Sequence, residues 1–233
     1  MSPEISIIIL LMINIPCYYF GGIWVCAFSF IITFYLALFV YGIVGKLELF
    51  QSHFRGGICY VKDYTGDYNS HNEVFDYMYK LIKEKDLNDF SIIALYYDIL
   101  KKGKENEKEQ RCSIGLYLKN DGNENYQMPE EIEKYLIVEE KFRKHNLVDT
   151  KSIHCSWNYF NNFNMMLGRR KFYNLIQKKL NSRRFLEAYN LKKEQLNVAI
   201  EVYENFFEEK NIYFYIPFEK SDKFFIYGKE KKE

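Results

Sequence analysis

The sequence predicts an α+β protein in which an N-terminal transmembrane segment precedes a domain of two strand–helix–strand–strand units. Three observations predict this class. Residues 5–45 are apolar and contain no acidic or basic side chain. After Gly56 and Gly57 the chain changes to short segments with alternating apolar and polar residues, which is typical of half-buried strands. The same order of strand-like and helix-like segments then recurs in the second half of the chain.

The apolar segment is long enough to cross a bilayer. About 20 apolar residues are needed to span the hydrocarbon core as a helix, and Ile23–Val44 meets this requirement alone, with Trp24 and Tyr41 near its ends. The preceding stretch, Ile5–Phe20, is interrupted by an asparagine and a proline. It is compatible with a second membrane helix, a re-entrant piece or an extension at the interface.

Flanking charges predict the orientation. Lys46, Arg55 and Lys62 follow the apolar segment, whereas only Glu4 precedes it, so the following domain should face the cytosol. One span would place the N-terminus on the other side, and a helical hairpin would keep both ends in the cytosol. The domain has single, unpaired cysteines and no Asn-x-Ser/Thr acceptor, which also favours a cytosolic location.

The first unit begins with the alternating segment Ile58–Tyr64, expected to be a strand. Ser70 and Glu73 match a capping box, so a helix with an apolar face should start there. Two further strands are expected at Ser91–Asp98 and Arg111–Lys119, joined by a charged hairpin loop.

The second unit repeats this order. Lys151–Tyr159 should form a strand, Asn162–Leu180 a helix, and Val198–Tyr203 with Ile212–Phe218 a closing hairpin. A helical stretch at Pro129–Phe142 should separate the units. Two such units side by side would place both helices on one face of a mixed sheet.

The expected organisation is therefore a membrane anchor at residues 1–45, a linker at 46–56, the α+β domain at 57–228 and a short charged tail at 229–233.

Several segments resemble a known family. CYVKDYTGDYNSHNEVFDYMYKLI is similar to the opening of GyrI-like domains, and the later segments that match in order are IIALYYD, RCSIGLYL, LGRRKFYNLIQKKLNSRRFLE, AIEVY and IYFYIPF. Together with an anchor directly before the domain, this order resembles the testis-expressed protein 264 family. The similarity extends from about Tyr41 to Phe218.

The resemblance implies an adaptor in the endoplasmic-reticulum membrane that acts as a receptor for reticulophagy, the selective autophagy of that organelle. Its implied partners are the lipid bilayer, ubiquitin-like autophagy modifiers and a AAA unfoldase, without direct contact to nucleic acid. Family members reach autophagy modifiers through a motif in a long C-terminal tail. Here only GKEKKE follows Tyr227, so that tail is missing.

GyrI-like domains also imply an alternative function, the binding of amphipathic or cationic small molecules in a groove. They commonly carry a glutamate four residues before the proline of the final strand; the matching proline here is Pro217, and the matching position is Tyr213. Glu201, on the partner strand, is a possible substitute but is expected to face solvent. The candidate groove residues are Tyr60, Tyr64, Tyr68, Trp157, Glu201 and Tyr213. Core and rim packing is the alternative role for these aromatic side chains.

Composition and motifs argue against other functions. The formal net charge of +1 gives no support for a nucleic-acid binder. The histidines and cysteines show no metal-ligand spacing, and no phosphate-binding, dinucleotide-binding or nucleophile-elbow motif is present. We therefore expect no cofactor, no metal and no enzymatic activity. An open, apolar groove with a buried carboxylate would favour the ligand binder, and a filled groove the adaptor.

Overall fold

The computed structural model describes residues 22–25, 27–35, 46–66, 71–98, 110–119, 128–159, 161–192, 196–204 and 210–228. The chain divides into two compact units, one comprising residues 1–46 and 159–170, the other residues 47–158 and 171–233.

In the first unit, residues 22–25 and 27–35 are helical. Their large apolar side chains are exposed, among them Trp24 at 84% and Phe28 at 67%. Within the described residues no helix is both long and apolar enough to cross a membrane. Most of the predicted anchor, including residues 5–20 and 36–45, lies outside the described residues.

In the second unit, eight described strands form one sheet in the order β1-β6-β8-β7-β3-β4-β2-β5. The strands are β1 (Phe50–Phe54), β2 (Gly57–Gly66), β3 (Ser91–Tyr96), β4 (Gln110–Lys119), β5 (Arg143–Leu147), β6 (Thr150–Asn158), β7 (Ala199–Glu204) and β8 (Asn211–Pro217). Each of the pairings is antiparallel, so the expectation of a mixed sheet is wrong.

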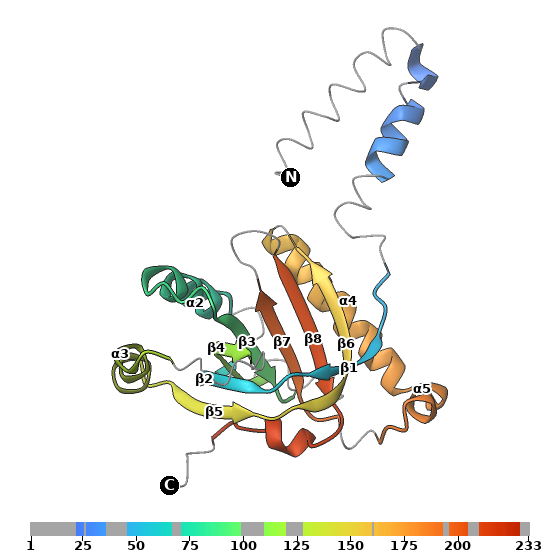
Figure 1. Cartoon of the computed structure of the whole chain (residues 1–233). Coiled ribbons are helices and arrows are strands. Elements are labelled where there is room, and N and C mark those ends of the chain that lie inside the picture. The colour runs from blue at the N-terminus through green and yellow to red at the C-terminus, as the bar shows by residue number, and fades with distance from the viewer. Residues whose placement is uncertain are drawn as a thin grey trace. The chain divides into compact units, whose positions relative to one another are not determined.

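The two predicted units are present. The first is β2, helix α2 (Asn72–Glu84), β3 and β4; the second is β6, helix α4 (Asn162–Leu180), β7 and β8. They meet where β3 pairs with β7 in the middle of the sheet (Figure 1). This is the arrangement expected from the resemblance to GyrI-like domains.

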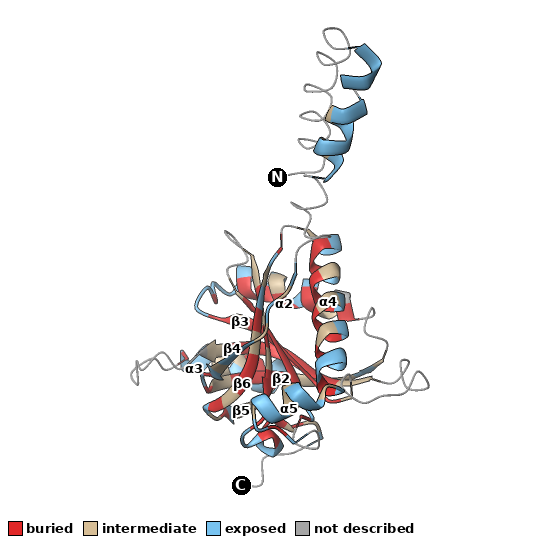
Figure 2. Cartoon of the chain, turned by 90° about the vertical axis from the view of Figure 1, so that its right-hand side faces the viewer, coloured by how far each residue is buried: buried red, intermediate tan, exposed pale blue. Residues whose placement is uncertain are grey.

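Both helices cover the same face of the sheet, which we call the helix face. Phe75 of α2 lies 4.8 Å from the ring of Tyr203, and Phe172 of α4 stacks on Phe214 at 4.4 Å. Glu201 pairs with Phe214, and Tyr203 lies two residues from Glu201, so these side chains share one face. Buried residues accordingly line the inner side of α4 and the sheet (Figure 2).

The start of α2 differs from the prediction. The helix begins after His71, which makes no side-chain capping hydrogen bond, and Ser70 lies outside the described residues.

Several further elements depart from the predicted boundaries. Residues 46–56 are more than a linker, because Phe50–Phe54 form β1, the strand next to β6. The middle helical stretch consists of α3 (Glu130–Lys134) and a π-helical turn (Tyr135–Glu139), after which β5 follows directly. The structure also contains α5 (Arg183–Ala188) and the 3₁₀ helix η5 (Ser221–Phe224).

The sheet is strongly curved. Four strands lie between β1 and β4 in the sheet order, yet Phe54 of β1 stacks on Tyr117 of β4 at 5.8 Å. Phe54 and Tyr117 belong to a buried cluster on the face opposite the helices, together with residues such as Val61, Leu95 and Val202. We call this the concave face. A second layer of the core therefore lies inside the curve of the sheet.

Candidate functional site

A pocket of about 200 Å³ lies on the concave face. Three aromatic side chains form part of its lining: Phe54, Tyr117 and Tyr215. The ring of Phe54 meets that of Tyr215 edge-on at 5.2 Å. The hydroxyl of Tyr117 donates a hydrogen bond to the carbonyl of Arg55 at 2.6 Å, which fixes the link between β1 and β2 against β4. The pocket is therefore built where the curved sheet brings β1, β4, β7 and β8 together.

The remaining lining is mostly polar and charged. It is supplied by His53, Arg55 and Glu204, and Val202 adds one apolar side chain. Burial, and next the negative charge of Glu204, raise the pKa of Tyr215 to about 12, while Arg55 acts in the opposite direction. Burial and Glu204 also raise the pKa of Tyr213. The hydroxyls of Tyr213 and Tyr215 are therefore neutral at physiological pH, and Glu204 and Arg55 place a negative and a positive charge in the same lining, of which Glu204 has the larger effect on Tyr215.

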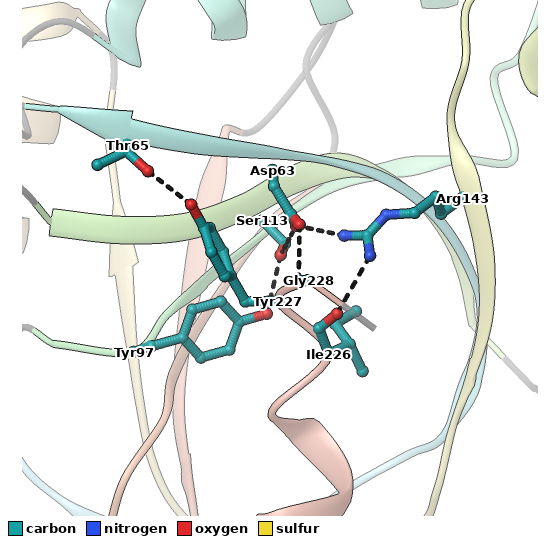
Figure 3. A network of polar contacts seen from close by, with 8 residues as sticks. All are labelled: Asp63, Thr65, Tyr97, Ser113, Arg143, Ile226, Tyr227 and Gly228. Carbon is teal, nitrogen blue, oxygen red and sulfur yellow. Dashed lines mark hydrogen bonds and ion pairs between the residues drawn. The ribbon is translucent and has the colours of Figure 1, made fainter. Parts of the chain in front are cut away.

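Another part of the concave face is covered by the chain itself. We call residues Phe224–Gly228 the C-terminal strap. Phe224 is fully buried and Ile226 is 5% exposed, and both belong to the concave-face cluster. Figure 3 shows the polar network beneath the strap, which centres on Asp63.

On the helix face, Glu201 is fully buried, so the expectation that it faces solvent is wrong. Its two carboxylate oxygens accept hydrogen bonds from the hydroxyls of Tyr173, at 2.7 Å, and Tyr203, at 2.6 Å. A buried carboxylate is costly unless it is hydrogen-bonded, and these two donors offset that cost. Glu201 therefore ties α4 to the middle of the sheet, on the side opposite the pocket.

The structure does not bring the predicted groove residues together. Tyr60 and Trp157 both lie on the helix face, in one row that crosses β2, β4, β3, β7, β8 and β6. Five strand spacings separate the two side chains, roughly 24 Å along the sheet. Tyr60 is buried beneath Lys144, whose ammonium lies 5.8 Å from its ring, and Trp157 lies beside Lys171.

The other predicted residues are also dispersed. Tyr64 pairs with Cys112 near the end of β2, and Tyr68 lies outside the described residues. Tyr213 is half-buried on the concave face, where its ring stacks with His154. Among the predicted residues that the structure describes, only Tyr213 shares a face with the pocket, through its neighbours His154 and Tyr215.

One contact between reactive residue types was not foreseen from the sequence. The thiol of Cys112 lies 3.4 Å from Nε2 of His71, and both side chains are buried. The two residues are 41 positions apart, so no sequence spacing could have indicated the pair. Because neither side chain is accessible, the pair packs the interior between α2 and β4.

Within the described part of the chain, no group of three or more histidine, cysteine, aspartate or glutamate side chains is placed to hold a metal ion.

Fold and pocket together define an α+β domain with two units and a concave, partly filled face. No protein-family model and no curated protein matches the sequence. Among solved structures, the chain is similar to the C-terminal domain of EcmrR, with 12% identity over 73% of this chain and 96% of that chain and a TM-score of 0.43.

It is also similar to SAV2435 bound to tetraphenylphosphonium, with 11% identity, coverage of 73% and 93%, and a TM-score of 0.42. A hydrolase from Listeria innocua shows 10% identity, coverage of 75% and 93%, and a TM-score of 0.41. At such low identity and TM-score, the fold rests on the strand order and the site on the contacts described above.

Proposed function

We propose that the chain is a membrane-tethered binding domain that holds a compact amphipathic molecule with a cationic group. The observation that carries this proposal is the pocket beside Phe54, in which three aromatic side chains and the carboxylate of Glu204 line one cavity. Aromatic faces attract cations, and a nearby carboxylate strengthens that attraction in a partly desolvated site. Ligand sites are typically concave and combine apolar walls with a few polar groups.

The size of the pocket limits the ligand. A volume of about 200 Å³ lies below the roughly 300–1,000 Å³ of common drug-sized sites, so the occupant should be a single ring with one short substituent. The ring would lie against Phe54, Tyr117 and Tyr215, and its charged group would face Glu204. Binding, rather than catalysis, is proposed because this arrangement holds a cation without presenting an activated nucleophile.

The tether is supported by the exposed apolar helix at residues 22–25 and 27–35. A run of exposed Ile, Val, Phe and Trp side chains is costly in water and favourable in a bilayer. Fewer than ten residues separate Val44 from His53 of the pocket, which span at most roughly 30 Å. A pocket this close to the anchor would meet amphipathic molecules that concentrate at the membrane surface.

The test is a titration of the full chain in detergent micelles with three probes of similar shape: benzyltrimethylammonium, benzyl alcohol and benzoate. Saturable binding of the cation, followed by calorimetry, is expected to be roughly tenfold tighter than that of either other probe. Glu204→Gln should remove this preference. Glu219→Gln, at an exposed carboxylate paired with Lys151 outside the pocket, is the matched control.

Tighter binding of benzoate would show that the pocket selects anions. Absence of saturable binding for all three probes, with the chain still folded, would contradict the ligand-binding function.

A second function, that of an adaptor, is favoured by the C-terminal strap, because the strap fills part of the concave face. The resemblance to reticulophagy receptors gives this role its location in the endoplasmic reticulum and its partners. Proximity labelling from the C-terminus in starved and fed cells tests it, with a chain lacking residues 1–44 as control. Starvation-dependent labelling of autophagosomal proteins that requires the anchor is expected of a receptor, and unchanged labelling in both conditions contradicts it.

A further inference from the structure

The C-terminal strap is bound to the sheet without becoming part of it. Among the described residues, β8 is the last strand, and η5 then reverses the chain before the strap crosses the concave face. The reversal passes through Lys220, whose φ of 54° places it in the left-handed region. The strap therefore does not pair with the sheet as a strand, and side chains of the sheet hold it in place.

Two side chains of the strap, spaced two residues apart, act as apolar anchors. Phe224 meets the ring of Phe54 edge-on at 5.5 Å, and both Phe224 and Ile226 are buried in the concave-face cluster. Phe224 ends η5, and Tyr227 and Gly228 form a turn, so the strap is a short irregular segment that buries its first and third side chains. The anchors thus occupy fixed positions, as the alternate side chains of a bound peptide do.

The other two aromatic side chains of the strap, Phe225 and Tyr227, pack against Tyr97 and Arg111 at the edge of the concave face. Phe225 and Tyr227 lie 4.7 Å and 5.9 Å from the ring of Tyr97. The guanidinium of Arg111 lies 5.5 Å from the ring of Phe225 and 5.7 Å from that of Tyr227, and it is itself held by two hydrogen bonds to the carboxylate of Asp98. A cation and a tyrosine ring therefore form an aromatic-binding rim.

The backbone of the strap is bound by fixed polar groups. The amide of Gly228 donates to Asp63 at 2.8 Å, and Arg143 donates to the carbonyl of Ile226 at 3.4 Å (Figure 3). Asp63 also forms an ion pair with Arg143 and accepts a hydrogen bond from the hydroxyl of Ser113 at 2.6 Å. These groups are ordered by one another, so little side-chain freedom is lost when a segment binds to them.

We propose that this part of the concave face is a peptide-binding groove, occupied in this structure by the chain's own C-terminal strap. The partner is a short segment with an aromatic and an aliphatic residue two positions apart, each followed by an aromatic residue, and then a glycine that can form the closing turn. Such a segment binds by exchanging places with the strap. The strap has the advantage of being tethered, which corresponds to an effective concentration on the order of millimolar.

This inference goes beyond the small-molecule pocket, since it concerns another part of the face and another class of ligand. The two sites share Phe54, which lines the pocket and also contacts Phe224. A bound peptide that shifts Phe54 would therefore alter the pocket.

The test uses a fluorescein-labelled peptide with the sequence of Ser221–Gly228 and the full chain in detergent micelles. The intact chain should bind the peptide weakly, because its own strap competes. A full chain carrying Phe224→Ala and Ile226→Ala should bind it at least roughly tenfold more tightly in fluorescence polarisation. A chain carrying Asp222→Ala and Lys223→Ala, at exposed positions of η5, is the matched control and should behave as the intact chain.

Two further variants test recognition itself. A labelled peptide with the same two alanine changes should not bind, because it lacks both anchors. Asp63→Asn, added to the chain with the weakened strap, should reduce peptide affinity roughly tenfold, since it removes the ion pair and a charged acceptor. Binding that depends on neither the anchors nor Asp63 would overturn the proposal.

Folding is followed by circular dichroism in every variant. If the chain with two alanine changes does not fold, a protease site inserted between Glu219 and Lys220 replaces it, and the cleaved chain is mixed with labelled peptide. Uptake of the peptide in place of the cleaved strap supports the groove, and a cleaved chain that remains folded but takes up none overturns it. An intact chain that is dimeric by light scattering, and that the peptide dissociates, would assign the groove to a second copy and overturn the partner peptide.

Discussion

Glu201 determines how helix α4 packs on the middle of the sheet. Its neighbours along β7 are apolar, and the carboxylate is placed where α4 approaches the sheet. The two tyrosine hydroxyls that bind it come from α4 and from β7 itself. Glu201 thus fixes the distance and the register between a helix and the sheet.

Replacing Glu201 by Ala is expected to lower the free energy of unfolding by about 2 to 4 kcal/mol, because two charge-assisted hydrogen bonds are lost and a small cavity remains. Glu201→Gln should cost about half as much, since the amide keeps the volume and one acceptor oxygen. Urea denaturation measures both. Equal stability of all three chains would mean that the carboxylate does not organise the interior.

Two buried thiols give a prediction about pH. Burial raises the pKa of Cys59 and of Cys155 from 9.0 to about 12 in the folded chain. Between these values the unfolded chain releases protons that the folded chain retains, so folding stability is present below pH 9 and falls as the pH rises toward 12.

At pH 8, Cys59 and Cys155 should therefore resist iodoacetamide, because they are buried and only about one thiol in ten thousand is ionised. Mass spectrometry of the labelled chain tests this, and a sample unfolded in urea at the same pH is the control. Labelling of either residue at the same rate in both samples would show that the sheet opens.

At the scale of elements, β4 depends on a glycine. A Cβ on Gly115 would lie 1.8 Å from the carbonyl oxygen of Tyr60 and 2.7 Å from Cα of Val61, both backbone atoms of β2. Backbone in the middle of a sheet cannot move aside without breaking its pairing. The close approach of β2 and β4 therefore requires glycine at this position.

Gly115→Ala should cost about 3 kcal/mol or more and lower the thermal melting temperature by several degrees. Gly228→Ala is the matched control: its Cβ would meet nothing within 4 Å, and only its φ of 67° carries a cost, about 1 kcal/mol. Similar melting temperatures for the two variants would contradict the pairing of β2 with β4.

The elements themselves were largely predictable. Local alternation located six of the strands, and α4 has the predicted bounds Asn162–Leu180, with basic residues in its last turn. β1 and β5 were missed, since FQSHF and RKHNL carry few apolar residues and are stabilised by pairing with β6 and β2. Their strand character is a tertiary effect that the local sequence does not encode.

The candidate site was predicted poorly for a related reason. Aromatic side chains are abundant, and alternation alone does not tell which face of a strand the helices cover. Phe54 of β1 reaches Tyr117 of β4, and so completes the pocket, only because the sheet curves; local alternation does not predict that curvature. The strap was missed because the apolar run Phe224–Gly228 is too short to show a strand or helix period, and its position over the sheet follows only from the tertiary fold.

At the scale of the whole molecule, the proposed tether predicts how the chain is oriented in a membrane. With a single span, an engineered glycosylation acceptor before Ile5 should be modified in microsomes, and a hairpin would leave it unmodified. An acceptor at residues 101–109, between β3 and β4, should remain unmodified in both cases if the domain faces the cytosol, as the flanking charges predict. Glycosylation at residues 101–109 would reverse the predicted orientation.

The pairing of β3 with β7, which joins the two units, has a consequence for folding during synthesis. Ile93 pairs with Val202, more than a hundred residues later, whereas β2, β3 and β4 pair within one short stretch of chain. During synthesis the first unit can therefore form its three strands before β7 leaves the ribosome. Until then, the backbone groups of β3 that later pair with β7 have no strand partner. An exposed strand edge attracts other chains. If a membrane captures the apolar N-terminus early, as the proposed tether requires, it would separate nascent chains during this interval and protect folding as well as determine location.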